Sequence, residues 1–407
     1  MIKTGTDIVE ISRFAKMQDI DLFLKHAFTK RERDYFGGLK NPCKSIAGAF
    51  AAKEAFSKYM GSGFRGFGLR DVEVLHDSLG KPYLVFMNNR ISADVSISHS
   101  DLYACAVVCG DAPAVGDDNA EYIKTYRAML PKRSPRFHKG NCGRVLAVAG
   151  SMGMVGAACL CARAAVRSGS GLVTLAVPQC VQPTAAAKLD EVMTFPLPDR
   201  DGIITADAIP RIQTQLEKSD VCAFGPGLGR GGAIFEVLGE LLKNSVPLVI
   251  DADGLNALSQ NTDILLGKRC SVILTPHPGE MSGLTGIPIA EIEQNRTKIA
   301  VDFAKKYDAV VLLKGHDTVI ASPDGGYHTN TTGNSGMATG GSGDVLTGII
   351  ASFVGQGVPV YNAAVLSAFL HGLSGDIAAE KYGEFSLAAG DLIKSLPTAI
   401  KAVSGAL

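Results

Sequence analysis

The chain has 407 residues, and its 40 lysines and arginines are balanced by 40 aspartates and glutamates. This length exceeds the roughly 150 residues of a typical domain, so we expect two domains, and zero net charge argues against a nucleic-acid or membrane-surface protein. Nine cysteines without metal-ligand spacing predict free thiols in a reducing compartment, and no apolar stretch reaches the roughly 18 residues of a membrane span. We therefore expect a cytoplasmic protein.

Residues 1–110 mix short strands and helices without regular alternation. Strands are predicted over residues 2–8, 72–75, 83–86, 94–98 and 103–108. One helix begins after Thr29, where Thr29 and Glu32 form a capping box, and another covers residues 43–59. The pattern predicts a compact α+β domain.

The composition changes after residue 110, where an acidic stretch turns basic and carries Pro131 and Pro135. We assign residues 111–126 to a linker with a short helical piece and residues 127–407 to the second domain.

Continuous apolar runs alternate with helical stretches in this second domain. They cover residues 145–149, 172–177, 221–224, 248–250, 272–274 and 310–313. Buried parallel strands that feed helices produce this pattern, so we predict a doubly wound α/β sheet. Ligands bind such sheets beyond the carboxyl ends of the strands, where the glycines and carboxylates of this chain fall.

Two carboxylates and a lysine form the first candidate site. Asp7 ends an apolar strand, while Glu54 and Lys58 lie four residues apart on one helix face. Converging carboxylates can hold Mg²⁺ and leave room for substrate phosphates. Two alternatives stay open, a surface ion pair between Glu54 and Lys58 and a strand-end cap at Asp7.

The first domain resembles holo-acyl-carrier-protein synthase, the AcpS-type phosphopantetheinyl transferase. The matching motifs, in order, are Gly5–Glu10, Phe28–Thr29, Phe50–Lys58, Gly80–Tyr83 and Val95–Ser100. The resemblance implies that a serine of acyl carrier protein attacks the β-phosphate of coenzyme A and releases adenosine 3′,5′-bisphosphate. It also implies active sites between the subunits of a trimer.

The same resemblance assigns the residues of this site. It implies that Asp7 and Glu54 bind Mg²⁺ on the coenzyme A pyrophosphate and that Lys58 steadies the phosphate charge in catalysis. Lys81, Pro82 and His99 are the further coenzyme A-binding candidates. Acidic carrier protein is expected to dock on a basic stretch, for which a solvated helical surface is the alternative. The stretch comprises Arg13, Lys16, Lys25, Lys30, Arg31 and Arg33.

A glycine run, Gly340–Gly343, precedes Asp344 and an apolar stretch over residues 345–353 that reads as a helix. Backbone amides and the helix N-terminus together make an anion site for a transferring phosphoryl group. Asp344 then stands where a general base is needed. A plain helix cap is the alternative, although a carboxylate in an anion site without a role would oppose phosphate binding.

Further polar loops follow the other strands of this domain. They are Gly150–Gly156, Gly225–Gly229, Asp251–Asn256, Thr275–Glu280 and Lys314–Thr318. The first loop is neither a Walker A motif nor a Rossmann fingerprint. Asp251 and Asp253 either cap the next helix or contact substrate. His277 and Glu280 either bind a metal or belong to a rigid substrate-facing loop. Lys314 either contacts nucleotide phosphate or extends to solvent.

From about residue 127 to 400 these motifs resemble the NAD(P)H-hydrate dehydratase family, which has a ribokinase-like fold. The segment His138–Gly140 is a further matching motif, in addition to the loops and the glycine run named above. The family uses ADP, or ATP in some members, to phosphorylate the hydrates NADHX and NADPHX, and loss of phosphate then restores NADH or NADPH.

The resemblance implies that Asp344 is the base on the hydrate hydroxyl. It places Ala157, Gly227 and His277 with Asp344 at the hydrate. The nucleotide site comprises Lys314, Gly315, His316, Asp317, Thr318 and Gly343. The pair His316 and Asp317 departs from the smaller or less acidic residues of relatives.

Residues 1–126 do not resemble the epimerase domain that bacterial relatives often carry, so we expect action on a single epimer of the hydrate. Two alternatives remain for the second domain, a vitamin or sugar kinase and a non-catalytic dinucleotide sensor.

Overall fold

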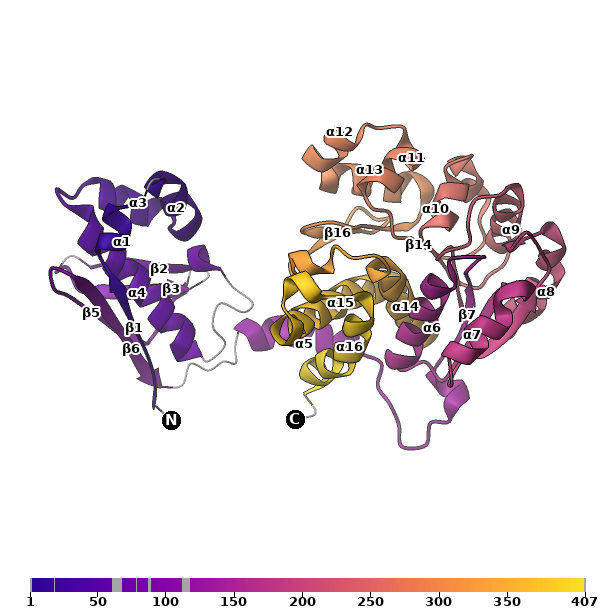
Figure 1. Ribbon diagram of the computed structural model, residues 1–407, viewed down its shortest axis with the longest axis horizontal. Coiled ribbons are helices and arrows are strands. Elements are labelled where there is room, and N and C mark those ends of the chain that lie inside the picture. Colours follow the sequence, from indigo (N-terminus) through magenta and orange to yellow (C-terminus); the bar gives the residue numbers. More distant parts are fainter. Residues whose placement is uncertain are drawn as a thin grey trace. The chain divides into compact units, whose positions relative to one another are not determined.

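The computed structural model describes residues 2–17, 19–60, 68–77, 79–86, 89–111 and 118–405. Contacts divide the chain into two compact units, Met1–Ile123 and Lys124–Leu407 (Figure 1). Each unit is described by itself. Residues 112–117, within the predicted linker, lie outside the described residues.

The first unit has an α+β fold, as predicted. Its strands are β1 (Ile2–Glu10), β2 (Val72–His76), β3 (Pro82–Phe86), β4 (Asn89–Arg90), β5 (Asp94–His99) and β6 (Tyr103–Asp111), and its helices are α1 (Ser12–Ala15), α2 (Ile20–Ala27), α3 (Lys30–Gly37) and α4 (Pro42–Met60). One antiparallel sheet has the order β1-β6-β5 and the other β2-β3-β4. The apolar side chains of α4 pack against the first sheet, and the predicted capping box of Thr29 and Glu32 starts α3.

Helix α5 (Asp118–Met129) leads into the second unit. Tyr126, near its end, is buried and stacks on Phe369 with ring centroids 3.8 Å apart. Its hydroxyl lies 3.0 Å from Nε2 of His328. These contacts anchor the last turn of α5 in the core of the second unit.

The second unit is a doubly wound α/β domain, as predicted. Its strands are β7 (Arg144–Val148), β8 (Leu172–Pro178), β9 (Met193–Leu197), β10 (Asp199–Arg200), β11 (Ile203–Ile204), β12 (Val221–Phe224), β13 (Leu248–Ile250), β14 (Val272–Leu274), β15 (Val310–Leu313), β16 (Thr318–Ala321) and β17 (Tyr327–Asn330). Its remaining helices are α6 (Val155–Arg167), α7 (Gln182–Lys188), α8 (Ile209–Leu216), α9 (Gly232–Leu242), α10 (Asp253–Leu258), α11 (Pro278–Thr285), α12 (Ile289–Gln294), α13 (Arg296–Tyr307), α14 (Ser342–Gly355), α15 (Val360–Tyr382) and α16 (Ala389–Ser404).

The large sheet has the order β17-β16-β15-β14-β13-β12-β7-β8-β9. It is parallel from β15 to β9, and β16 and β17 extend one edge as an antiparallel pair. After β7 the chain builds outward to β8 and β9, and it then returns beside β7 with β12. The strand order therefore reverses between β7 and β12, and such a reversal opens a ligand-binding crevice at the carboxyl ends of the strands.

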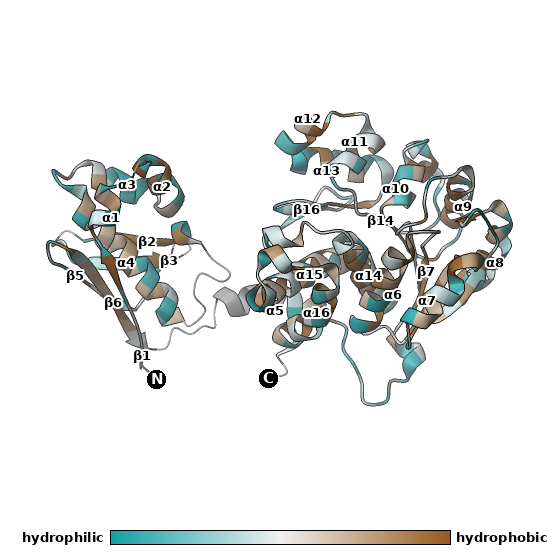
Figure 2. Cartoon of the chain, viewed as in Figure 1, coloured by the Kyte–Doolittle hydropathy of each residue, from teal (hydrophilic) through white to brown (hydrophobic). Residues whose placement is uncertain are grey.

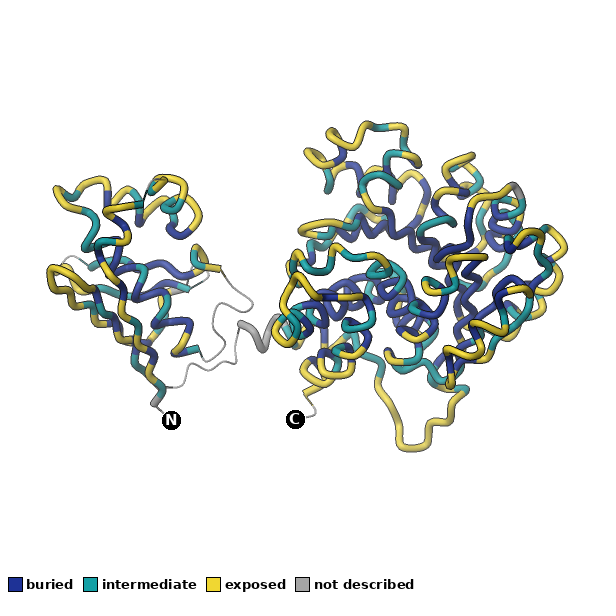
Figure 3. The backbone as a smooth tube through the Cα atoms, in the orientation of Figure 1, coloured by how far each residue is buried: buried dark blue, intermediate teal, exposed yellow. Residues whose placement is uncertain are grey.

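Helices cover both faces of this sheet. Alternate strand residues such as Val145 and Leu146 enter two separate cores, one with α6, α14, α15 and α16 and the other with α8, α9, α10 and α13. The central strands β7 and β14 are largely brown in Figure 2, and the same segments are largely dark blue in Figure 3, because both faces of the sheet are apolar and buried there. This two-sided burial explains the continuous apolar runs in the sequence. Among the described residues, no helix is long and apolar enough to cross a membrane.

Gly225 follows β12 in a backbone conformation that favours glycine, with φ of 130°. A Cβ atom there would lie 1.8 Å from the Asp251 carbonyl oxygen. We expect Gly225→Ala to lower the free energy of unfolding by roughly 2–4 kcal/mol, through strain and overpacking. Gly239→Ala is the matched control, because a Cβ at this α9 position meets nothing within 4 Å and should stabilise the helix by up to about 1 kcal/mol. Urea unfolding of both variants checks this pair, and equal stabilities would contradict the expectation.

Candidate active sites

The structure brings Asp7, Glu54 and Lys58 together in the first unit. The Lys58 ammonium lies 2.8 Å from Oδ1 of Asp7 and donates to the Thr6 carbonyl at 3.0 Å. Burial and the nearby charge of Asp7 raise the pKa of Glu54, while the charges of Lys58 and Arg13 oppose this rise. Strand β1 and helix α4 thus contribute charged side chains to one cluster. In this cluster Lys58 forms its ion pair with Asp7 and not with Glu54.

This cluster fits a magnesium ion. Its two carboxylates supply the hard oxygen donors that Mg²⁺ prefers, and they lie close enough that, after burial, the charge of Asp7 contributes to the raised pKa of Glu54. No group of three or more His, Cys, Asp and Glu side chains suited to a metal occurs among the described residues. A carboxylate pair nevertheless suffices for Mg²⁺ when substrate phosphates complete its coordination.

The other predicted coenzyme A residues lie on two sheets of this unit. His99 is exposed at the end of β5, in the sheet that also holds Asp7. Lys81 and Pro82 stand at the start of β3, and the Lys81 ammonium lies 3.3 Å from Asp94 on β5. In the predicted basic stretch, Arg33 is half-buried and the other five side chains are exposed, with Arg31 paired to Glu73.

A cavity of about 980 Å³ lies at the carboxyl ends of β13, β14 and β15 in the second unit. It gathers most of the residues predicted for the second site. Its lining includes His277, Lys314, Gly315, His316, Asp317, Thr318, Gly343 and Asp344. Asp251, Ser342 and His371 also line it. Segments far apart in the sequence thus converge on one site.

Asp344 lies in the first turn of α14, directly after the glycine run. Gly341 is the N-cap of this helix and has φ of 93°, which glycine adopts without strain. Burial, reinforced by the nearby charge of Asp251, raises the pKa of Asp344 to about 7, although Lys314 opposes this shift. A carboxyl group with this pKa suits proton transfer at neutral pH.

Lys314 follows β15 and does not extend into solvent. Its side chain is 20% exposed, and its ammonium lies 2.7 Å from Oδ1 of Asp251 and 3.6 Å from Oε2 of Glu280. Burial alone would lower the pKa of Lys314, but these two carboxylates raise it. A permanently charged ammonium therefore lines the cavity.

His277 caps helix α11. Its Nδ1 accepts from the backbone amides of Gly279 and Glu280 at 3.0 and 3.2 Å, and the Glu280 side chain accepts from the His277 amide at 2.8 Å. Nδ1 is therefore unprotonated and engaged, which favours the substrate-facing loop over the metal-site alternative. The His277 side chain is 56% exposed, and its Nε2 lies 3.6 Å from Oε1 of Glu280.

Gly227 and Ala157 lie beside each other where the strand order reverses. A Cβ at Gly227 would lie 3.0 Å from that of Ala157. The buried Ser151 hydroxyl donates to the Gly227 carbonyl at 2.9 Å and joins the loops after β7 and β12. Ser151 was not among the predicted site residues, although its position after a buried strand and Gly150 could have indicated it.

His316 and Asp317 are the two residues that depart from those of relatives. Nδ1 of His316 lies 3.2 Å from Oδ2 of Asp317, and the two side chains are 95% and 54% exposed.

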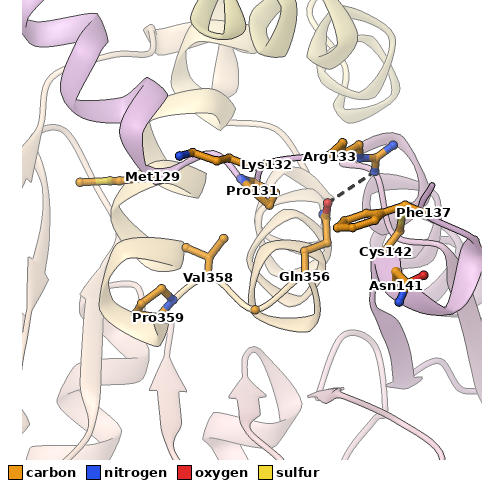
Figure 4. Close-up of a pocket in the computed structure, with 11 residues that line it drawn as sticks. Met129, Pro131, Lys132, Arg133, Phe137, Asn141, Cys142, Gln356, Val358 and Pro359 are labelled. Atoms are coloured by element: carbon orange, nitrogen blue, oxygen red, sulfur yellow. Dashed lines mark hydrogen bonds between the residues drawn. The ribbon is translucent and has the colours of Figure 1, made fainter. Parts of the chain in front are cut away.

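A second cavity, of about 340 Å³, lies before the start of β7 and after the end of α14. Lys132, Arg133 and Phe137 line one side, and Gln356 and Val358 line another, as Figure 4 shows. Arg133 donates to Gln356 at 3.4 Å. The described lining contains no carboxylate and no imidazole, whereas the lining of the larger cavity contains both.

Comparison with known proteins decides the family. Residues 145–398, more than half of the chain, match the family model described as NAD(P)H-hydrate dehydratase. The chain belongs to the NAD(P)H-hydrate dehydratase family. Residues 3–108 match the model of the 4′-phosphopantetheinyl transferase superfamily. The chain thus joins a transferase-type domain to a dehydratase domain, as the sequence motifs indicated.

Some relatives of the dehydratase domain match it over nearly their whole length. The ADP-dependent (S)-NAD(P)H-hydrate dehydratase of Neisseria meningitidis is 39% identical over 70% of this chain and 94% of its own. A crystal structure of the Bacillus subtilis ADP/ATP-dependent enzyme, co-crystallized with ATP and Mg²⁺, has a TM-score of 0.61 and 32% identity, and covers 69% of this chain and 97% of its own. A structure from Enterococcus faecalis, titled a ribokinase-like superfamily protein, has a TM-score of 0.60 at 28% identity, which agrees with the predicted fold.

A bifunctional NAD(P)H-hydrate repair enzyme of Moorella thermoacetica is 50% identical over 277 residues. These residues are 68% of this chain and 52% of the relative, so the chain spans about half the length of that protein.

Proposed function

We propose that the second unit dehydrates the (S) epimer of NADHX or NADPHX to NADH or NADPH, with ADP or ATP as the phosphoryl donor. The observation that carries this proposal is Asp344, a carboxylate of raised pKa at the N-terminus of α14, in a cavity that also holds the Lys314 ammonium. Relatives named as ADP-dependent dehydratases and as an ADP/ATP-dependent enzyme support it.

The site would work in two steps. Asp344 removes the proton of the hydrate hydroxyl while this oxygen attacks the terminal phosphorus of the nucleotide, so that ADP leaves as AMP or ATP as ADP. The backbone amides of the glycine run and Lys314 stabilise the negative charge of the transferring group. Phosphate then departs as the ring nitrogen donates its electron pair, and loss of a ring proton restores the dihydronicotinamide.

The direct test mixes the full chain with NADH hydrate, Mg²⁺ and either ADP or ATP. We expect the reduced-nicotinamide absorbance to return with at least one nucleotide and a nucleotide product to form in equal amount. A stable phosphorylated compound without restored NADH would instead indicate a small-molecule kinase. Nucleotide binding without any turnover would favour a dinucleotide sensor.

We propose that the first unit transfers 4′-phosphopantetheine from coenzyme A to a serine of acyl carrier protein. Asp7 and Glu54 would hold Mg²⁺, which supplies charge neutralisation at the pyrophosphate, and Lys58 would contact the phosphates. Lys81, Pro82 and His99 would bind the coenzyme. The match of residues 3–108 to the transferase superfamily and the charge cluster of β1 and α4 support this.

Incubation of apo acyl carrier protein with the chain, coenzyme A and Mg²⁺ tests this second activity. We expect a mass increase of one phosphopantetheine group, strong dependence on Mg²⁺, and loss of activity in Glu54→Gln. No mass increase with active carrier protein would reject the transferase function.

We propose that the chain forms a homo-oligomer, as the transferase resemblance implies, and an exposed apolar face supports this. Ile8 on β1 and Val107 on β6 are 63% and 37% exposed on the β1-β6-β5 sheet, although large aliphatic side chains are more often buried. Sedimentation of the chain should therefore give a species larger than a monomer, and Ile8→Glu should shift it toward the monomer. A purely monomeric wild type would contradict this.

A further inference from the structure

Asp251 is a buried carboxylate at the end of β13, only 1% exposed. It does not cap the helix that follows, because the N-cap of α10 is Ala252 and no side chain caps it. Ala252 has φ of 46° and ψ of −117°, a strained conformation for a residue with a Cβ. The neighbouring Asp253 has a separate role, since it accepts from the Gly229 amide at 2.8 Å.

Both oxygens of Asp251 are engaged inside the second unit. Oδ1 pairs with the Lys314 ammonium at 2.7 Å. Oδ2 accepts from the Thr347 hydroxyl at 2.7 Å, and Thr347 is fully buried in α14. The same hydroxyl lies 3.2 Å from the Gly343 carbonyl, one turn earlier in the helix. A single carboxylate therefore connects α14 to the lysine that follows β15.

These contacts hold the Lys314 ammonium beside the glycine run. A Cβ at Gly343 would lie 3.4 Å from Nζ of Lys314 and 3.7 Å from Oδ2 of Asp251. The ammonium is thus next to the backbone amides that begin α14, where an anionic phosphate would bind. Without its carboxylate partners, a buried ammonium with four rotatable bonds would have no defined position there.

We propose that Asp251 and Thr347 are positioning residues of the dehydratase site, in which Thr347 fixes the Asp251 carboxylate and Asp251 fixes the Lys314 ammonium for the nucleotide phosphate. This inference rests on the proposed dehydratase function. Neither Asp251 nor Thr347 needs to contact the hydrate or the nucleotide in this role.

The same carboxylate influences Asp344. Asp344 is surrounded by charged or titratable groups from every neighbouring element, namely Asp251 and Asp253 beyond β13, Glu280 on α11, Lys314 beyond β15, Cys161 on α6 and His371 on α15. The negative charge of Asp251 raises the pKa of Asp344, while Lys314 lowers it. Removal of the Asp251 charge should therefore lower the pKa of Asp344.

Two variants test the proposal in the full chain. In Asp251→Asn we expect the dissociation constant for ADP to rise about tenfold or more, because a charge-assisted anchor of Lys314 is lost. We also expect the acidic limb of the pH–rate profile to move to lower pH. In Thr347→Val, which keeps the shape of the side chain, ADP binding should weaken severalfold, and Thr347→Ser should restore it.

Ser367→Ala is the matched control, since this buried α15 hydroxyl has no hydrogen-bond partner among the described residues. It should leave ADP binding unchanged. Unchanged ADP binding and an unmoved pH profile in both Asp251→Asn and Thr347→Val, with an active wild type, would overturn the proposal. If the wild type binds ADP but never restores NADH, the dehydratase function fails. Weaker ADP binding in the variants would then still support the positioning of Lys314.

Discussion

Replacement of Asp344 by asparagine should slow NADH-hydrate dehydration by about 10²–10⁴-fold, the usual contribution of a general base. Asparagine keeps the size of the side chain but cannot accept the hydroxyl proton. Stopped assays that quantify restored NADH and released AMP measure this loss. A rate within a few fold of wild type would remove Asp344 from the role of base.

The wild-type rate should also depend on pH in a way that the variant does not share. Because the pKa of Asp344 is about 7, its carboxylate disappears as the pH falls below neutrality. We expect kcat/KM to fall about tenfold for each pH unit well below pH 7. The residual rate of Asp344→Asn should lack this acidic limb.

Stability provides a control for this variant. A carboxyl pKa that is raised by folding makes the folded protein bind the proton more tightly than the unfolded chain does, so the contribution of Asp344 to the stability of the wild type falls as the pH rises from about 4 to about 7. Asparagine removes this dependence. Asp344→Asn should therefore be at least as stable as wild type at about pH 8, and an activity loss accompanied by equal or higher stability cannot be due to unfolding.

Most of the parallel strands were predictable because their composition reflects burial on both faces, but the edge strand β9, which is mostly half-buried or exposed, was not predicted. The bounds of β12, β13, β14 and β15 agree with the sequence prediction to the residue. Strands β16 and β17 were not predicted, although Pro323–Gly326 between them is a turn signal. Their short, mixed runs lack the continuous apolar character of the central strands.

Only the residues of the candidate site that local sequence motifs mark were predictable. Asp344 and Lys314 stand out because a glycine run and a strand end mark them. The partners of Asp251 lie 63 and 96 residues away in the sequence, and no local pattern pairs a lysine with a threonine inside an apolar helix. The alternative roles of Asp251 could therefore be separated only by the fold.

Lys53 illustrates the same limit in the first unit, where it lies within the transferase motif beside Glu54. The structure buries it completely and surrounds it with acceptors. It pairs with Glu32 at 2.9 Å and donates to backbone carbonyls of Ala27, Leu69 and Val72. Glu32 in turn accepts from the amides of Thr29 and Val74 at 2.9 Å each. The pair joins α2, α3, α4 and β2.

Lys53→Met should therefore destabilise the first unit by about 3–5 kcal/mol, because it leaves the Glu32 carboxylate buried without its cation. Lys44→Met is the control on the same helix. Lys44 pairs with Asp101, whose side chain is 95% exposed, and loss of such a surface pair should cost less than about 1 kcal/mol.

Hydrogen exchange read by mass spectrometry distinguishes these outcomes, because it reports the two units separately in the full chain. Lys53→Met should sharply reduce the protection of peptides from α4 and β1, while peptides from α14 and α15 keep theirs. Glu32→Gln added to Lys53→Met should recover part of the loss, since an amide is less costly to bury than an unpaired carboxylate. Equal protection in Lys53→Met and Lys44→Met would show that the buried pair contributes no more than a surface pair, and the motif lysine would then need a role at the transferase site itself.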